Sequence, residues 1–444
     1  MSIPSLHDLH RLYYNQIARA QAFLEENSHA DLSRVKCLLR MMMPKEVHDE
    51  IEKLHECRDP HITYNILGGN NLLAPQAKTI KQHIYHIPSD SMDLQRQPFS
   101  SIDLSDPFFD SLRSSYEGFD NWFRKKAARN EMATVYYDNG HLKDFLYLKI
   151  EDTAMTDVEP SLPACRRLKV GTFKIENRGT RRGERLMKKL LDIAVAEDVD
   201  ETYVTIFPES RLQCLIKSFQ CFGFQLKSFK HHSDGRIENV YVRDMRSHSS
   251  DILAHYPFIK MDSDRYFMLS IKPEYHTRLF PDSILKNEQK YDVIQDLSET
   301  NSIYKIYICW MRDVAQLQRG DKVIIYRTND HKGPANYRSV CTSVCTILEI
   351  RKKADFASEE EYLRYAKKYS VFSESDLLGW YRNRPGFIII KMAYNIAFTR
   401  KVILKELREE VGLEPDYWGF FQLTAEQFDH ILRLGAINER YLIR

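Results

Sequence analysis

Hydrophobic and polar residues alternate from Leu168 to Ile175, and the spacing then becomes helical. The alternating stretch predicts a strand. The helix that follows is predicted by five apolar residues at helical spacing: Leu186, Leu190, Leu191, Ile193 and Ala194. Between strand and helix lies Arg178–Gly183, a glycine-bearing turn with three arginines. Such a turn presents backbone N–H groups at the positive end of a helix dipole, so it predicts an anion site suited to a pyrophosphate.

The residues after this helix continue the alternation of strands and helices. Tyr203–Phe207 is a β-branched and aromatic run that predicts a strand. Arg211–Cys221 has apolar residues at helical spacing and is followed by Phe222-Gly-Phe224. A last strand is predicted over Glu238–Arg243.

A hairpin and two helices are predicted upstream. Ala133–Tyr137 and Phe145–Ile150 flank Asp138-Asn-Gly140, which is a strong hairpin signal. Asp106–Arg113 and Gly118–Lys126 are predicted to be helices.

The turn and the order of these elements resemble the GNAT N-acetyltransferase superfamily over residues 104–246. The acyl-CoA pyrophosphate loop of that superfamily reads Arg/Gln-x-x-Gly-x-Gly/Ala. Arg178 takes its first position and Gly183 its last, while Arg181 stands where the middle glycine is usual. The resemblance implies a mixed-sheet α/β domain that binds acetyl-CoA. The residues it implies for cofactor binding are Phe173, Lys174, Ile175, Arg178, Gly179, Arg181, Arg182, Gly183 and Glu184.

The resemblance also implies acid–base chemistry, for which several residues are candidates. In this superfamily the backbone polarises the thioester carbonyl, and a carboxylate or water deprotonates the amine. For the base, the candidates are Glu151, Asp152 and Glu176, each of which can also be read as a solvated carboxylate at a strand end. The tyrosine that often protonates the thiolate is replaced by Phe219, which has no proton to give. Either Ser218, Tyr203 or a water takes that role, or the thiolate leaves unaided, or the domain binds acyl-CoA without catalysis.

The spacing of apolar residues predicts that residues 1–100 form a mainly helical region, whose role is undefined. One helix is expected at its start, a second over Leu32–Met43 and a third from Pro44 to His55. Glu46, Asp49, Glu50 and Glu52 could form a metal-dependent nuclease cluster, but Glu46, Asp49 and Glu50 equally suit a solvated helix face. There is some likeness to proteins that place a PIN nuclease domain before a GNAT domain. A PIN domain needs an early apolar strand ending in Asp, which is lacking here, so a degenerate and inactive domain is expected. Gly68–Asp106 is rich in Pro, Ser, Asp, Gln and His and predicts a loop or linker.

A different module begins near Asp262. Arg265–Arg278 is a strand that turns at Lys272-Pro273 into a helix, and it closely resembles the opening of the ASCH domain, a small PUA-like β-barrel. The later elements follow in the expected order, with Leu317–Arg327 containing a Gly-Asp turn. The remaining segments are the strands Ile303–Met311, Ser339–Arg351 and Gly386–Met392 and the helical insert Ser358–Lys367. The likeness covers residues 262–440.

The ASCH resemblance implies nucleic-acid binding beside the first strand–helix turn. Lys and Arg would contact phosphate, and aromatic rings would stack on bases. The residues of suitable type near that turn are Lys272, Tyr275, His276, Arg278, Tyr326 and Arg327, with Trp310 as a further stacking candidate. Tyrosines on barrel strands can equally be half-buried core. Tyr417–Phe421 reads as packing, and Thr424–Gln427 as the cap of a last helix.

Composition narrows the class further. A length of 444 residues suggests about two to four domains. The net charge of +2 means that any basic binding surface is local. Eight cysteines without a CxxC pair, and histidines without zinc-ligand spacing, favour a reduced protein without a metal site. No signal peptide and no apolar run of about 18 residues is evident, so we expect a cytoplasmic location and no membrane contact.

These observations predict a multidomain α/β and α+β protein with an acetyltransferase activity. The favoured function is acetyl-CoA-dependent N-acetyl transfer, with a PUA-like domain that delivers an RNA acceptor such as a tRNA. The alternatives are a protein or small-molecule acetyltransferase with a structural C-terminal barrel, and a non-catalytic acyl-CoA-responsive RNA-binding protein. The oligomeric state is left open.

Overall fold

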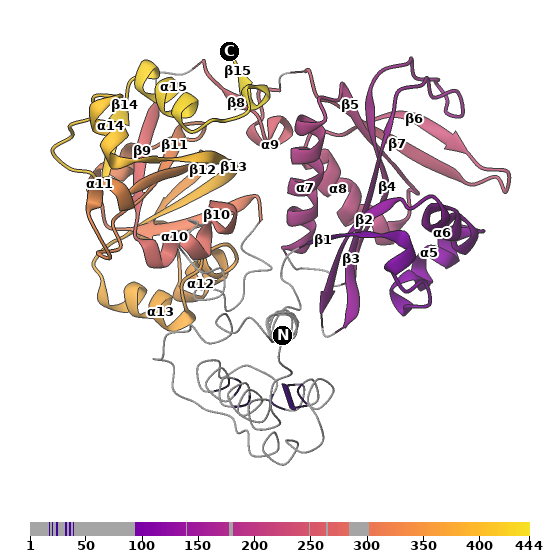
Figure 1. Ribbon diagram of the computed structural model, residues 1–444, viewed down its shortest axis with the longest axis horizontal. Helices are drawn as coiled ribbons and strands as arrows, with labels where there is room; N and C mark the ends of the chain where they lie inside the picture. Colours follow the sequence, from indigo (N-terminus) through magenta and orange to yellow (C-terminus); the bar gives the residue numbers. More distant parts are fainter. Residues whose placement is uncertain are drawn as a thin grey trace, which may run out of the picture. The chain divides into compact units, whose positions relative to one another are not determined.

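The computed structural model (Figure 1) describes residues 94–138, 140–176, 181–247, 249–262, 265–283 and 302–444. It also describes seven helical residues nearer the start: Ile17, Ala20, Leu24, Leu32, Val35, Lys36 and Leu39. The acidic cluster at Glu46 and the rest of the suggested PIN-like region lie outside the described residues. The chain divides into two compact units, Met1–Lys143 and Asp144–Arg444.

The first unit contains a strand pair and the two predicted helical segments. Strands β1 (Gln95–Pro98) and β2 (Met132–Asp138) pair antiparallel. Its helices are η2 (Phe99–Ser101), η3 (Pro107–Phe109), α5 (Asp110–Ser115) and α6 (Phe119–Ala128). β1 corrects the expectation of a continuous loop before Asp106, because its backbone groups are satisfied by β2 rather than by local sequence.

The second unit begins with a mixed sheet of strand order β3-β4-β5-β7-β6. Its strands are β3 (His141–Glu151), β4 (Arg167–Ile175), β5 (Glu201–Ile206), β6 (Gln225–His231) and β7 (Ile237–Asp244). Its helices are α7 (Arg182–Ala196), η4 (Ser210–Leu212) and α8 (Gln213–Cys221). The strand, helix and strand predicted from 168 to 207 are confirmed. β6 is an addition that pairs antiparallel with β7.

Helix α7 connects the parallel strands β4 and β5. Its apolar face is buried, with Leu186, Leu190 and Leu191 each 0% exposed. Figure 1 shows α7 and α8 beside these strands. This helix-connected parallel pair is the arrangement in which the carboxyl end of one strand and the start of the next helix meet at one edge of the sheet.

The C-terminal half of the second unit forms a six-stranded sheet of order β10-β13-β12-β11-β9-β14. The strands are β9 (Tyr266–Ile271), β10 (Tyr304–Cys309), β11 (Lys322–Arg327), β12 (Val340–Lys352), β13 (Ile388–Ile403) and β14 (Phe420–Leu423). The α-helices are α9 (Ile252–His255), α10 (Pro273–Leu279), α11 (Ala335–Arg338), α12 (Glu359–Lys367), α13 (Glu374–Asn383), α14 (Leu404–Glu409) and α15 (Ala425–Leu434). The 3-10 helices are η5 (Pro281–Ser283), η6 (Arg312–Gln316), η7 (Lys353–Asp355) and η8 (Glu439–Tyr441). A short pair, β8 (Ile259–Lys260) and β15 (Leu442–Ile443), lies apart from this sheet.

The expected closed barrel is not confirmed. The six-stranded sheet begins at β10 and ends at β14, and no pairing joins these two edges among the described residues. Both faces of the sheet are instead covered: Phe267 and Leu269 of β9 belong to one buried cluster, and Tyr266 and Met268 to another. The two larger sheets of the unit fall within the ranges predicted for two domains, whose boundaries stay a prediction.

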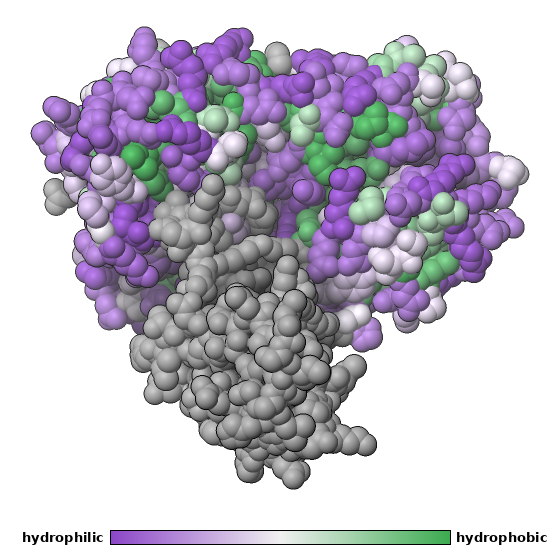
Figure 2. Space-filling model, viewed as in Figure 1, coloured by the Kyte–Doolittle hydropathy of each residue, from purple (hydrophilic) through white to green (hydrophobic). Residues whose placement is uncertain are grey.

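On the face shown in Figure 2, the described residues are mostly hydrophilic, with hydrophobic residues in separate patches. Among all the described residues, no helix combines the length and apolar character needed to cross a membrane.

Candidate active site

Strands β4 and β5 separate part of the way along their length. Their parallel register runs from Arg167↔Glu201 to Val170↔Val204 and stops there, although β4 continues to Ile175. Beyond Val170, β4 stays paired with β3 and β5 with β7. The facing edges of β4 and β5 therefore carry backbone groups that this sheet does not pair, and we call this region the strand gap. It lies at the carboxyl ends of parallel strands, where ligands bind in α/β sheets.

The first turn of α7 lies close to the end of β4, as the proximity of Gly183 to Ile175 shows. Of the predicted cofactor residues, Phe173, Lys174 and Ile175 form the last part of β4, and all three are partly exposed. Arg178 and Gly179 lie outside the described residues. At Gly183 an added Cβ would lie 3.2 Å from Ile175 Cδ1, so a small residue lets the helix start close to the strand end.

Arg182, one of the predicted cofactor residues, points into the fold, and its role in cofactor binding stays a prediction. Its side chain is buried, and its guanidinium lies 3.5 Å from the Asp144 carboxylate of β3. Asp144 is 0% exposed. Burial raises the pKa of Asp144 to about 6, although the charges of Arg182 and Arg185 act in the opposite direction. The Asp144–Arg182 pair therefore links the first turn of α7 to β3.

Arg181 and Glu184 contact the segment that follows α12. The Tyr369 hydroxyl donates a hydrogen bond of 2.7 Å to Glu184 Oε1. The Arg181 guanidinium lies 5.4 Å from the Tyr369 ring centre and donates to the Lys367 carbonyl at 3.4 Å. Burial raises the pKa of Glu184, opposed by the Tyr369 hydrogen bond and by nearby cations. Two residues predicted for the cofactor are thus joined to a segment about 185 residues away in the sequence.

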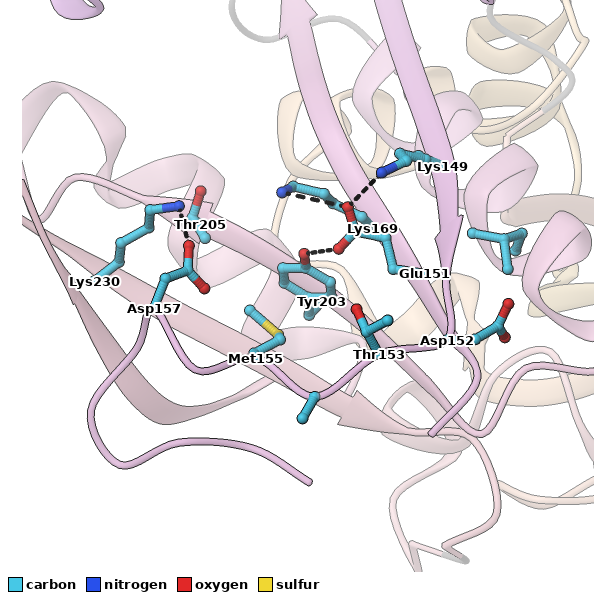
Figure 3. Close-up of a pocket in the computed structure, with 12 residues that line it drawn as sticks. Lys149, Glu151, Asp152, Thr153, Met155, Asp157, Lys169, Tyr203, Thr205 and Lys230 are labelled. Atoms are coloured by element: carbon cyan, nitrogen blue, oxygen red, sulfur yellow. Dashed lines mark hydrogen bonds and ion pairs between the residues drawn. The ribbon is translucent and has the colours of Figure 1, made fainter. Parts of the chain in front are cut away.

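A polar pocket of about 470 Å³ lies on one face of β3, β4 and β5 (Figure 3). Its lining includes both a carboxylate that the sequence predicts and a tyrosine opposite it. Glu151 Oε2 accepts a hydrogen bond of 2.6 Å from the Tyr203 hydroxyl. The lining residues are Lys149, Ile150, Glu151, Asp152, Thr153, Ala154, Met155, Asp157, Lys169, Tyr203, Thr205 and Lys230.

Glu151 is the centre of the charged groups in this pocket. Its Oε1 accepts a hydrogen bond of 3.0 Å from Lys149 and lies 3.8 Å from Lys169. Burial by itself would raise the pKa of Glu151, but the Tyr203 hydrogen bond and the two lysines outweigh it, so the pKa is lowered. Burial first, and then the Glu151 carboxylate, raise the pKa of Tyr203. Glu151 is therefore ionised at neutral pH, while Tyr203 keeps its proton.

The other catalytic candidates lie outside the pocket lining. Glu176 is exposed at the end of β4, and Ser218 is a partly exposed residue of α8. Phe219 is 0% exposed, and its ring packs against Phe173 and Phe224 at centroid distances of 5.3 and 4.9 Å. The residue at the expected tyrosine position is thus part of the hydrophobic core.

The structure separates the six predicted nucleic-acid residues into two groups. Three of them, His276, Tyr326 and Arg327, are buried, and their role in binding nucleic acid stays a prediction. His276 Nε2 lies 2.8 Å from Thr342 Oγ1, and burial lowers its pKa well below the usual value. Tyr326 packs against Trp418, and Arg327, 1% exposed, donates to the Arg338 carbonyl at 3.3 Å. Their polar groups are used inside the fold.

The other three residues, Lys272, Tyr275 and Arg278, stay at least partly exposed on or beside α10. The Tyr275 ring contacts Phe372, whose ring contacts Trp380. The sequence suggested Trp310 as a residue that stacks on a base, but it gave no specific sign that Trp380 and Arg384 lie beside it. The available signal was a tryptophan four residues before an arginine at the end of a helix, which is too common to be specific.

Comparison with known proteins gives no family model and no curated protein that matches this chain. Solved structures that resemble it include both of the families suggested by the sequence. The ASCH protein of Zymomonas mobilis is 10% identical, with 39% of this chain and 96% of that chain covered and a TM-score of 0.27. The ribosomal-protein-S18-alanine N-acetyltransferase of Escherichia coli is 12% identical, with coverages of 36% and 99% and a TM-score of 0.26. A GNAT family acetyltransferase of Elizabethkingia anophelis with acetyl-CoA bound is 10% identical, with coverages of 34% and 97% and a TM-score of 0.24.

Proposed function

We propose that this protein is an acetyl-CoA-dependent N-acetyltransferase whose acceptor is an RNA, such as a tRNA, or an amine carried by RNA. The observation that carries the proposal is the separation of β4 and β5 after Val170, beside the first turn of α7. The Glu151–Tyr203 pocket is built on the same two strands and on β3. An extended thioester cofactor and an acceptor amine would then meet on adjacent parts of one sheet.

The strand gap fits the chemistry of acetyl-CoA. Backbone N–H and C=O groups on the facing strand edges can pair with the amides of an extended cofactor arm. The start of α7 offers N–H groups to a pyrophosphate, and Arg181 stands beside them. Glu184 is the one acidic residue in this first turn, and its raised pKa weakens its opposition to an anion.

The pocket supplies the acid–base groups. Glu151 accepts a proton from the acceptor amine as the nitrogen bonds to the acetyl carbon. The carbon–sulfur bond then breaks, and the Tyr203 hydroxyl, which keeps its proton at neutral pH and contacts Glu151, passes its proton to the departing thiolate and regains one from Glu151. Ser218 or a water can replace Tyr203 as that donor, and Glu176 can replace Glu151. Phe219 takes no part, because its ring is buried and carries no proton.

Cofactor binding is the first test. Calorimetry with acetyl-CoA should give micromolar binding for the wild type and a large loss for Arg178→Ala/Gly183→Asp, which removes a cation and places a carboxylate at the helix start. A matched control is Glu197→Gln at the opposite end of the same helix, which should bind as the wild type does. Wild-type protein that does not bind acetyl-CoA would refute the proposal.

Turnover separates the two classes of function that bind acetyl-CoA. CoA release with an RNA acceptor should fall by about 10²- to 10⁴-fold in Glu151→Gln while acetyl-CoA affinity is kept. Phe219 favours the second candidate, a non-catalytic acyl-CoA-responsive RNA-binding protein. That candidate predicts tight acetyl-CoA binding without CoA release for the wild type and for Glu151→Gln alike.

A further inference from the structure

One end of the six-stranded sheet carries a row of aromatic rings that reaches the surface. Figure 1 shows α10, α13 and β10 at this end of the sheet. The row runs from Tyr275 of α10 to Phe372, then to Trp380 of α13 and to Trp310, which follows β10. The successive centroid distances are 5.0, 4.8 and 5.1 Å, and each pair meets edge to face. We call these four residues the aromatic row.

The row changes from core to surface along its length. Phe372 is 8% exposed and belongs to the buried cluster of the sheet, whereas Trp310 is 44% exposed. Among the described residues, six large hydrophobic side chains are exposed, and Trp310 is the one tryptophan. Burying the whole indole would stabilise the fold more than leaving it in water. Its exposure therefore suggests a binding role, and its contact with Trp380 fixes its position at the surface.

One cationic side chain lies beside the exposed end of the row, and a second contacts the backbone of the same turn. The Arg384 guanidinium lies 5.6 Å from the Trp310 ring centre. The Lys353 ammonium donates to the Arg384 carbonyl at 2.7 Å, and so lies beside the same turn. At the other end of the row, the charge of Arg278 acts on Tyr275, and Lys272 precedes Tyr275 by three positions in the sequence. Acidic residues are present too, since Glu274 and Asp376 help to raise the pKa of Tyr275 after burial, so the basic character is concentrated at Arg384 and Lys353.

We propose that Trp310, backed by Trp380 and flanked by Arg384 and Lys353, stacks on an unpaired base of a single-stranded RNA. A flat ring held at the surface beside cations suits a base and its adjoining phosphate. Bases inside a duplex are stacked on one another and do not offer a free face. This inference deepens the RNA part of the proposed function: it names single-stranded RNA as the class of partner and the aromatic row as its site.

The test is fluorescence anisotropy of the full-length protein with a labelled 12-nucleotide RNA of mixed sequence. We expect Trp310→Ala to weaken binding about tenfold or more and Trp310→Phe to retain most of the affinity, because a phenyl ring still stacks. Arg384→Ala should reduce the slope of log affinity against log salt by about one, the change expected for one lost phosphate contact. Phe229→Ala, which removes a 40% exposed ring from β6 of the other sheet, is the matched control and should bind RNA as the wild type does.

Binding measurements with two further nucleic acids, an RNA duplex and a single-stranded DNA, decide the class of partner. A duplex of the same RNA sequence should bind more weakly than the single strand and should not distinguish Trp310→Ala from the wild type. Single-stranded DNA of equal affinity would overturn the assignment to RNA, and unchanged RNA affinity of Trp310→Ala would overturn the stacking site. Acetyl-CoA calorimetry on Trp310→Ala should give the wild-type result, so failure at the aromatic row is distinguishable from failure of the acetyltransferase proposal.

Discussion

Replacing Asp144 by asparagine tests the link between β3 and the first turn of α7. The Asp144 carboxyl is 0% exposed, and burial raises its pKa from 3.8 to about 6. Because the folded pKa lies above the unfolded one, folding favours the protonated carboxyl. Its favourable contribution is complete below pH 3.8 and is lost as the pH rises through about 6.

The two pKa values set the size of the effect. The pKa of Asp144 is 3.8 in the unfolded chain and about 6 in the folded protein. Compared with a carboxyl that stays protonated, ionisation of Asp144 therefore lowers the free energy of unfolding by about 0.5 kcal/mol at pH 4 and about 3 kcal/mol at pH 7. The amide of the Asp144→Asn variant does not titrate. Above pH 6 the variant lacks the attraction between the Asp144 carboxylate and Arg182, which makes its gain in stability smaller. The folded pKa of Asp144 already includes this attraction, so it needs no separate correction. From pH 4 to pH 7 the stability of Asp144→Asn relative to the wild type should therefore rise by about 2.5 kcal/mol.

The difference in the free energy of unfolding between the variant and the wild type is measured by urea titration at pH 4, 5, 6 and 7. At each urea concentration, unfolding is followed by hydrogen exchange of peptides from α7. That readout follows the element that Asp144 anchors rather than the whole chain. Asp152→Asn is the surface control, because its carboxylate is 65% exposed and should not reproduce the pH dependence. A stability difference between Asp144→Asn and the wild type that is the same at every pH would refute the reasoning.

Two hydroxyl deletions test the partly buried carboxylates of Glu151 and Glu184. Tyr203→Phe removes the hydrogen bond that lowers the pKa of Glu151, so the acid limb of the kcat/KM profile should move to higher pH; an unmoved limb would exclude Glu151 as the base. Tyr369→Phe leaves the buried Glu184 carboxylate without its donor and should lower the free energy of unfolding by about 1–3 kcal/mol in urea titration. Tyr365→Phe, whose hydroxyl donates to Glu349 in an exposed hydrogen bond, is the control and should change stability by less than about 0.5 kcal/mol; equal losses in the two variants would contradict the role given to burial.

Several elements were predictable because their signals are local. The alternation from 168 to 175 and the helical spacing after it produced β4 and α7, and the Thr424–Gln427 pattern forms a capping box at the start of α15. β1 was missed because a short polar segment becomes a strand only through pairing with β2. Tyr417 was expected to pack but is 58% exposed, because residue type alone does not fix burial.

The candidate sites show the same division. Residue types near a strand–helix turn suggested six nucleic-acid contacts, but burial of His276, Tyr326 and Arg327 depends on which faces of the sheet are covered. Trp310 was recognisable as a stacking candidate, whereas its contact with Trp380 joins residues 70 positions apart in the numbering. Likewise, Glu151 was predictable as a strand-end carboxylate and Tyr203 as a candidate proton donor, but the hydrogen bond between them was not.

The sequence by itself determined many of the segments that form strands and helices, β4 and α7 among them, and it predicted an anion-binding turn and a strand-end carboxylate. Those properties follow from periodicity and residue chemistry over a few neighbouring residues. Only the tertiary structure decided that β4 and β5 part after Val170, that Arg182 turns inward to Asp144, and that Glu184 meets Tyr369. These features join residues far apart in the chain, and burial and pairing, rather than local preference, set their charges and their exposure.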